Sequence, residues 1–441
     1  MKLERKMTRR KFLKGAVGTA AVVTLGGRLE VGRSYAKDPI KVGASLSLTG
    51  KYAWTGERMH EGYRVWERLV NEKGCSPGLE KYGHASPGLI DGRPIKLIIY
   101  DDKSDPATGV KLYQKLITSD KVDLVMGPYS SAVTKAISPI VERAEMPTVT
   151  SGASDPGIWK GMKLKWVVQG MPTTDEYSPG VAEIGAKYGA KTAAVIFEDT
   201  SFPIALAIST RGHLERKGIK VVLFEPYPKG ITDWTPPLRK AWALKPDIIG
   251  IGAYEPDAIG LTKAAQAIKA TPKFFYWTVA TYSPHYVESV GDACLAMTGE
   301  VVWDPSLNTP GNKEFVKGFE KIIGTPVGQQ AEHAAMGFFG CQLLEIAVKR
   351  VGSLNRKAIR DMLFKMEAET VAGPYKVEPL ESDDSGLQVA FKCFLIQWHK
   401  KKAGTAAPPD KAVIGNYIRE IIFPERFKTA DAIYPFPGWD R

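Results

Sequence analysis

Short apolar runs rich in Val and Ile alternate along this chain with longer segments in which apolar residues recur every three or four positions. Short continuous apolar runs predict buried strands, whereas the longer recurrence predicts helices with one apolar face. Val133, Ile137 and Val141, for example, fall on one face of an expected helix. Strands that alternate with helices are typical of parallel sheets with crossover helices, so we expect an α/β fold.

Two series of such units follow one another. The first has the predicted strands Ile40–Leu46, Ile95–Asp101, Leu124–Met126 and Thr148–Thr150, and the predicted helices Gly56–Glu72, Ala107–Ser119 and Ser131–Glu145. The second has the predicted strands Trp166–Val168, Thr192–Phe197, Lys220–Phe224, Asp247–Ile251 and Phe274–Trp277, and the predicted helices Thr174–Tyr188, Phe202–Arg216, Trp234–Leu244 and Glu255–Ile268. Two series of this size predict two doubly wound parallel-sheet lobes.

The last third of the chain fits neither lobe alone. It has a predicted strand at Gly299–Trp303, helices at Lys313–Ile323, Gln330–Val351 and Arg356–Met366, and a late strand at Val389–Gln397. We expect a hinge of three segments, near Val168–Gly170, Val302–Pro305 and Pro379–Gly386. Residues 37–168 then form lobe 1, completed by 303–382, and residues 169–302 form lobe 2, completed by 383–441. An insert rich in Gly and Pro, Gly74–Gly92, is interpreted as a passive surface loop.

The N-terminus has the pattern of an export signal. Thr8–Lys14 contains an arginine pair followed by Phe and Leu, and the mildly apolar stretch Gly15–Gly27 is too short to span a membrane. Ser34 and Ala36 offer the small residues that a signal peptidase reads, so we expect cleavage after Ala36. The sequence therefore predicts twin-arginine export to the periplasm, with residues 1–36 removed.

Charge and cysteine spacing exclude several classes of protein. The formal charge of +12 falls to +5 without the leader, which has nine basic and two acidic residues, and no long run of like charges remains. Nucleic-acid binding and binding to an anionic membrane surface are therefore not supported. Membrane insertion is not expected either, because no second apolar run of 18 or more residues occurs. Cys75, Cys294, Cys341 and Cys393 are too widely spaced for a metal or iron–sulfur motif, so we expect no cofactor and assign no disulfide pairing. Cys341 and Cys393 lie in apolar segments and are expected to be buried.

No enzyme motif is complete. Gly250–Glu255 begins like a dinucleotide fingerprint, but Glu255 stands where the third glycine is required. Glu332 and His333 have no second histidine at metal-ligand spacing, so His333 is interpreted as a core or surface residue. His285 follows Pro284 at an expected helix start and is at most a rim residue. We therefore expect that the protein is not an enzyme.

Several segments together resemble the leucine/isoleucine/valine-type periplasmic binding proteins of ABC importers. They are Ile40–Gly43, Ser47–Gly50, Asp101–Pro106, Gly127–Ser131, Pro147–Val149, Phe197–Thr200 and Tyr227–Pro228, with Gly56 and Gly62 in the first helix. The resemblance covers about residues 38 to 400. It implies an exported receptor, expected to be a monomer, that closes two lobes around a small ligand and delivers it to a permease in the inner membrane. The same receptor architecture also serves membrane sensor kinases, so sensing stays an alternative.

The candidate binding residues follow strand ends, because ligands of open α/β sheets lie outside the carboxyl ends of the strands. They are Tyr52, Trp54, Tyr129, Ser130, Ser131, Ser151, Gly152, Ser154, Asp199, Phe202, Tyr254 and Thr278. A helix N-terminus suits a carboxylate, and Ser131 and Ser154 add hydroxyl donors there. In the resembled family, the segments that match Ser130–Ser131 and Ser151–Ser154 hold the α-carboxylate of the ligand, and the ring at the position that matches Tyr254 covers the ligand. Serines at helix starts are also common caps.

The ligand class stays open at this point. The resembled amino-acid receptors have a carboxylate after the strand that matches Phe274–Trp277, where it accepts the ammonium of the ligand, but this chain has Thr278–Thr281. A buried ammonium without a charged partner is costly. An aromatic or aliphatic acid or amide is therefore a rival to a hydrophobic amino acid, unless Glu198, Asp199 or Glu255 takes over the ammonium.

Overall fold

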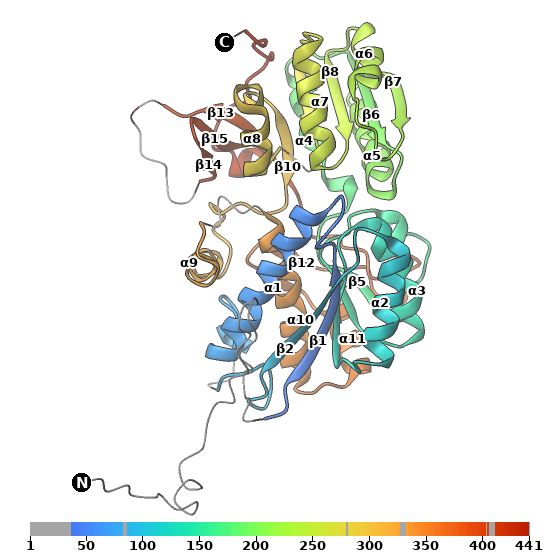
Figure 1. Ribbon diagram of the computed structural model, residues 1–441, viewed down its shortest axis with the longest axis vertical. Coiled ribbons are helices and arrows are strands. Elements are labelled where there is room, and N and C mark those ends of the chain that lie inside the picture. Colours follow the sequence, from blue (N-terminus) through green and yellow to red (C-terminus); the bar gives the residue numbers. More distant parts are fainter. Residues whose placement is uncertain are drawn as a thin grey trace, which may run out of the picture.

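A computed structural model describes residues 37–82, 86–278, 281–326, 332–402, 404 and 411–440. The chain forms two lobes, each built around its own sheet, which are stacked along the long axis of the molecule (Figure 1). The predicted two-lobed α/β fold is confirmed. The signal sequence predicted for residues 1–36 lies outside the described residues.

The first sheet has the strand order β2-β1-β3-β4-β5, with all neighbouring strands parallel. Its strands are β1 (Ile40–Leu46), β2 (Ile95–Asp101), β3 (Leu124–Met126), β4 (Thr148–Thr150) and β5 (Val167–Gln169). β1 is an inner strand and is almost entirely buried. The strand predicted at Trp166–Val168 was assigned to the second series, but β5 pairs with β4 and closes the first sheet.

The second sheet has the order β14-β15-β13-β10-β9-β8-β6-β7. Its strands are β6 (Thr192–Glu198), β7 (Lys220–Tyr227), β8 (Ile248–Gly252), β9 (Phe274–Trp277), β10 (Thr298–Val301), β13 (Phe394–Lys400), β14 (Val413–Ile414) and β15 (Tyr417–Phe423). The part from β7 to β10 is parallel, whereas β13 pairs antiparallel with β10 and with β15. The sheet is therefore mixed at one edge, which the helix-strand alternation did not indicate.

Helices cover both sheets. They are α1 (Ala53–Lys73), α2 (Pro106–Thr118), α3 (Ser131–Arg143), α4 (Pro179–Lys187), α5 (Ser201–Arg216), α6 (Thr235–Ala243), α7 (Glu255–Ala267), α8 (Pro284–Val290), α9 (Asn312–Ile323), α10 (Glu332–Val351) and α11 (Arg356–Lys365), with short 3-10 helices η2 (Glu80–Tyr82), η3 (Pro156–Ile158), η4 (Thr174–Glu176), η5 (Gly291–Cys294) and η7 (Glu425–Phe427). A small hairpin, β11 (Ala368–Thr370) and β12 (Gly373–Tyr375), follows α11. The buried helix α10 packs along α1, so the last third of the chain returns to lobe 1 before it joins the second sheet.

The close approach of α1 and α10 depends on glycine. A Cβ at Gly62 would lie 2.0 Å from the carbonyl oxygen of Ala334 and 2.8 Å from the amide nitrogen of Phe338. We expect Gly62→Ala to lower the free energy of unfolding by ~1–3 kcal/mol, because the two helices must separate. Gly318→Ala is the matched control, since its Cβ would have no neighbour closer than 3.5 Å and alanine favours a helix. Urea unfolding measures both, and equal effects would contradict the packing explanation.

The chain crosses between the lobes after β5, after β10 and before β13. The third crossing comes later than expected, because the segment Pro379–Gly386 is bound to lobe 1. The amide of Gln169 donates to the carbonyl of Gly386, and Ser385 Oγ donates to the carbonyl of Leu164. The strand predicted at Val389–Gln397 therefore lies later in the chain, as β13 (Phe394–Lys400). The exact lobe boundaries within the chain stay a prediction.

The Gly/Pro-rich insert is anchored in the core of lobe 1, so its interpretation as a passive loop is wrong for the residues described. Ser76 and Leu79 are buried, and the amide of Ser76 donates to Glu345 Oε1 on α10 at 3.0 Å. Glu345 also accepts from Trp66 Nε1 on α1, at 2.9 Å. One carboxylate therefore joins the insert, α1 and α10.

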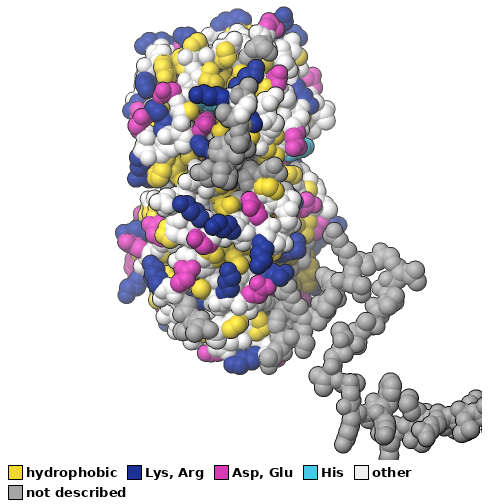
Figure 2. Space-filling model, turned by 90° about the vertical axis from the view of Figure 1, so that its left-hand side faces the viewer, with side chains coloured by type: hydrophobic (Ala, Val, Ile, Leu, Met, Phe, Trp, Pro, Cys, Tyr) yellow, Lys and Arg dark blue, Asp and Glu magenta, His cyan; other side chains and the backbone are white. Residues whose placement is uncertain are grey.

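The surface charges are mixed, and the two cysteines expected in the core are buried. Basic and acidic side chains are interspersed over the face of both lobes shown in Figure 2. Cys341 and Cys393 are buried as expected, although Cys393 precedes β13, and the four cysteines are free. Among the described residues, no helix has both the length and the apolar composition that a membrane span requires.

Candidate functional site

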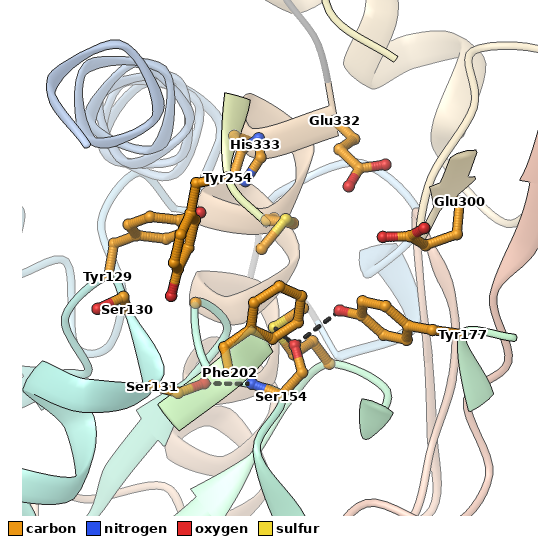
Figure 3. Close-up of a pocket in the computed structure, with 13 residues that line it drawn as sticks. Tyr129, Ser130, Ser131, Ser154, Tyr177, Phe202, Tyr254, Glu300, Glu332 and His333 are labelled. Atoms are coloured by element: carbon orange, nitrogen blue, oxygen red, sulfur yellow. Dashed lines mark hydrogen bonds between the residues drawn. The ribbon is translucent and has the colours of Figure 1, made fainter. Parts of the chain in front are cut away.

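A narrow pocket with a cavity volume of about 20 Å³, partly open to solvent, lies where the two lobes meet (Figure 3). It is lined by residues of both lobes and of the first crossing: Tyr129, Ser130, Ser131, Gly152, Ser154, Met171, Tyr177, Phe202, Tyr254, Glu300, Glu332, His333 and Met336. The structure thus brings together predicted residues from four separate strand ends. The lining also has two buried acidic residues, Glu300 and Glu332, that were not predicted as binding residues.

One end of the pocket is formed by the start of α3 and the loop after β4. Ser131 Oγ accepts hydrogen bonds from the amides of Ser154 and Asp155, both at 3.2 Å. Ser154 Oγ shares a 2.7 Å hydrogen bond with the hydroxyl of Tyr177. Ser130 Oγ is buried and has no hydrogen-bond partner among the described residues. Hydroxyl groups and the free amides of a helix start are suited to an anionic or carbonyl oxygen.

Aromatic rings form the side wall. The ring of Phe202, at the start of α5, lies 5.9 Å from Tyr177 and 5.6 Å from Tyr254, which precedes α7. Tyr52 supports this wall from lobe 1, with its ring 4.6 Å from Tyr254 and 5.7 Å from Tyr129. Burial raises the pKa of Tyr254 and Tyr177 well above the usual tyrosine range, so both hydroxyls are neutral. The wall is apolar in its faces and hydrogen-bonding at its edges.

The opposite end has acidic groups and a neutral histidine. Glu300 lies on β10 in lobe 2 and Glu332 begins α10 in lobe 1, and Figure 3 shows both side chains at the same end of the pocket. Burial raises the pKa of Glu332 well above its ordinary value, an effect that Arg419 opposes and the charge of Glu300 reinforces. Burial lowers the pKa of His333 to about 3, so its ring is uncharged and bonds to the hydroxyl of Tyr282.

A family described as periplasmic binding protein matches residues 39–402 of this chain. The chain belongs to the periplasmic binding protein family. The resemblance seen in the sequence is therefore confirmed. This binding protein is 24% identical over 408 residues to the Leu/Ile/Val-binding protein homolog 1 of Brucella suis, which covers 90% of the chain and 98% of the relative.

Solved structures of solute-binding proteins have the same fold. One, from an ABC transporter of R. palustris and in complex with 4-hydroxybenzoate, matches with a TM-score of 0.72 at 21% identity, over 87% of this chain and 96% of that one. A leucine-binding protein from Thermotoga maritima matches with a TM-score of 0.69 at 20% identity, over 81% of this chain and 95% of that one. At such identities the matches establish the fold and leave the ligand of this binding protein open.

Some predicted binding residues lie outside the pocket of this binding protein. Asp199 is exposed, and Thr278 Oγ1 is occupied by the carbonyl of Ile251 at 3.0 Å and the amide of Ala253 at 3.2 Å. Ser151 is buried toward α10, because a Cβ at Gly340 would lie 2.4 Å from its Oγ. Asp199, Thr278 and Ser151 each follow a strand end, but none of their side chains lines the pocket.

Two predicted aromatic residues lie beside the pocket. Tyr52 stands behind its aromatic wall, as described above, and the ring of Trp54 lies 6.4 Å from His333. Trp54 lines a separate surface cleft with Arg58, Pro284 and His285. The rim position expected for His285 agrees with its half-exposed side chain.

Six pocket residues were not predicted as binding residues, although one of them, Met171, closely follows the end of β5. They are Met171, Tyr177, Glu300, Glu332, His333 and Met336. The interpretation of His333 as an ordinary core or surface residue is therefore incomplete, since it is buried and also lines the pocket. Glu300 and Glu332 did carry a signal, because acidic residues are rarely buried inside apolar elements unless something pairs with them.

Proposed function

We propose that this protein is the exported solute receptor of an ABC importer and that it binds one small ligand between its lobes. The observation that carries the proposal is the pocket itself, because its lining comes from both lobes. Ligand contacts from both sides favour the closed arrangement of the lobes over an open one. We further propose that closure is what a permease in the inner membrane recognises, and that the twin-arginine signal ahead of Lys37 delivers the protein to the periplasm.

The ligand carries an acid or carbonyl group in this proposal. The serines and helix start at one end of the pocket support it, and the aromatic wall supports an apolar or aromatic body. The relatives favour two classes: the Brucella suis protein is named for leucine, isoleucine and valine, and the R. palustris structure contains 4-hydroxybenzoate. A hydrophobic amino acid and an aromatic acid are therefore the first ligands to compare.

A thermal-shift screen tests the proposal. The chain from Lys37 is unfolded, dialysed to remove carried ligand, refolded, and mixed with hydrophobic amino acids, amides, urea or aromatic acids at ~1 mM. A ligand with micromolar affinity adds ~4 kcal/mol of apparent stability, which raises the melting temperature measurably. Failure of every compound to raise it would contradict this ligand range.

The serine end of the pocket has its own prediction. We expect Ser131→Ala combined with Ser154→Ala to weaken ligand binding by more than tenfold, or ~1.4 kcal/mol, because two hydroxyl groups at the proposed acid end are lost. Calorimetric titration with the compound that raises the melting temperature measures the change. Ser119→Ala, at the exposed end of α2, is the control. Unchanged affinity in the double variant would remove both serines from the site.

A further inference from the structure

A surface cleft lies beside the pocket and is much larger than it. The cleft has a cavity volume of about 400 Å³, against about 20 Å³ for the pocket. Its lining comes from both lobes: Trp54 and Arg58 on α1, Pro284, His285 and Glu288 on α8, and residues 413–415 at β14. Among the described residues, none lines both cavities. The cleft is therefore a separate space, which the proposed function does not yet use.

A thin layer of side chains separates the cleft from the pocket. On lobe 1, the ring of Trp54 in the cleft meets the ring of His333 in the pocket edge to face, with centroids 6.4 Å apart. On lobe 2, Glu255 follows the pocket residue Tyr254, and its Oε1 lies 3.4 Å from Nδ1 of the cleft residue His285. The two cavities are thus immediate neighbours.

Trp54 is the part of this layer that can move. His333 is buried, and its ring is held by the hydroxyl of Tyr282 and by the ring of Tyr129 at 5.4 Å. Trp54 is only partly buried, and its indole has no hydrogen-bond partner among the described residues. Rotamer changes of exposed side chains are much faster than hinge motions of whole lobes. Separation of the lobes must also break the buried ion pairs of Lys51, so rotation of Trp54 is the easier way to open the pocket.

We propose that Trp54 is the gate of a side entrance, through which a small molecule passes from the cleft into the pocket while the lobes stay closed. This inference rests on the proposed function, because it concerns the ligand pocket of the receptor. Lobe closure then holds the ligand from both sides, and Trp54 sets how fast the ligand enters and leaves. A gate lowers or raises one barrier for both directions, so it changes both rate constants equally and leaves the dissociation constant unchanged.

Acylation of His333 by diethyl pyrocarbonate tests the side entrance independently of the ligand. The reagent acylates neutral histidine rings, and the ring of His333 is uncharged because burial lowers its pKa to about 3. Peptide mass spectrometry of the chain from Lys37 follows each histidine separately. We expect Trp54→Ala to speed the acylation of His333 at least fivefold, and Trp54→Phe to have a smaller effect. His285 lies on the cleft side of the gate, so its unchanged rate is the internal control.

A cross-link between the lobes separates the side entrance from ordinary lobe opening. Ser201 Oγ, at the start of α5, donates to the carboxylate of Asp155 in lobe 1, so cysteines at these positions are within reach of each other. We expect His333 to react in the oxidised Asp155→Cys/Ser201→Cys protein as fast as in Ser201→Cys alone, which cannot form this cross-link. A tenfold slower reaction in the cross-linked protein would show that entry needs lobe separation, and would overturn the side entrance. An unchanged rate in both Trp54 variants, with melting temperatures that show them folded, would overturn it as well.

Ligand kinetics give a second readout. Stopped-flow fluorescence with leucine and with 4-hydroxybenzoate measures both rate constants in the unchanged protein and in Trp54→Phe. For a compound that binds, we expect both constants to rise by the same factor and the dissociation constant to stay the same. A weaker dissociation constant with an unchanged association rate would instead make Trp54 a ligand contact and contradict the gate. If neither compound binds, the proposed ligand range is at fault, whereas the acylation rates still decide the side entrance.

Discussion

Replacing Lys51 by methionine is expected to weaken ligand binding by about a hundredfold. Lys51 follows β1 in lobe 1. Its ammonium pairs across the lobes with Glu198, the last residue of β6, and with Asp257 of α7, at 2.9 Å from the latter. Both acidic side chains are buried, at 0% and 2% exposure, whereas the lysine is 17% exposed. Removing one partner of a buried ion pair costs ~3–5 kcal/mol, because the remaining charge is left without compensation.

In the proposed closure mechanism, that cost falls on the closed arrangement. When the lobes separate, water can reach Glu198 and Asp257, so the loss of Lys51 penalises contact between the lobes more than it penalises folding. A ligand that binds the closed arrangement must then supply the difference, and ~3 kcal/mol corresponds to about a hundredfold in the dissociation constant. We expect Lys51→Met to weaken ligand binding more than Ser131→Ala or Ser154→Ala does, because it leaves two buried carboxylates without their cation.

Titration calorimetry measures the affinity of the Lys51→Met variant, and small-angle scattering of the ligand-free protein measures its radius of gyration, which we expect to increase. Lys217→Met is the matched control, because Lys217 pairs with Glu183 on the exposed surface of lobe 2. Combining Lys51→Met with Glu198→Gln should restore part of the affinity. If the Lys51→Met variant binds the ligand as tightly as the unchanged protein, the ion pairs of Lys51 add nothing to the free energy of lobe closure.

Local patterns predicted most of the strands, and the errors have identifiable physical causes. The predicted bounds of β1, β2, β3, β4 and β9 agree with the structure, because each is a short apolar run between clear turns. The predicted helix Thr174–Tyr188 is divided into η4 and α4, since Pro179 removes an amide donor and fits only the first turn of a new helix. The late strand, predicted at Val389–Gln397, begins only at Phe394, because the segment before it stays with lobe 1, where Val377 forms a β-bridge with Gln388.

The site was predictable where it depends on strand ends and unpredictable where it depends on long-range contact. Ser131, Ser154, Phe202 and Tyr254 line the pocket because strands of parallel sheets end at one edge. Glu300, within β10, and the residues at the start of α10 reach the pocket only because the chain crosses between the lobes. The position of the residues at the start of α10 therefore depends on the packing of α10 against α1, which no local pattern specifies.

A buried ion pair in lobe 1 gives the largest expected effect on stability. Glu345 and Lys349, one turn apart on α10, have fully buried side chains, with Glu345 Oε1 3.3 Å from Lys349 Nζ. Lys349 also donates to the carbonyl of Gly74, where the insert begins. We expect Glu345→Leu to lower the free energy of unfolding by ~3–5 kcal/mol, because it leaves the Lys349 ammonium buried without a negative partner and removes the acceptor of Trp66 and Ser76.

Urea unfolding of the chain from Lys37 measures this loss, and the partner helix α1 provides the control. Arg68 and Glu72 on α1 have the same spacing but are about half exposed, so Glu72→Leu should cost only ~0.3–0.5 kcal/mol. Adding Lys349→Leu to Glu345→Leu should recover part of the stability, because no unpaired charge then stays buried. Equal losses for Glu345→Leu and Glu72→Leu would show that burial adds nothing to this pair. A large loss restricted to Glu345 would instead establish that the insert is held by charge at the junction of α1 and α10.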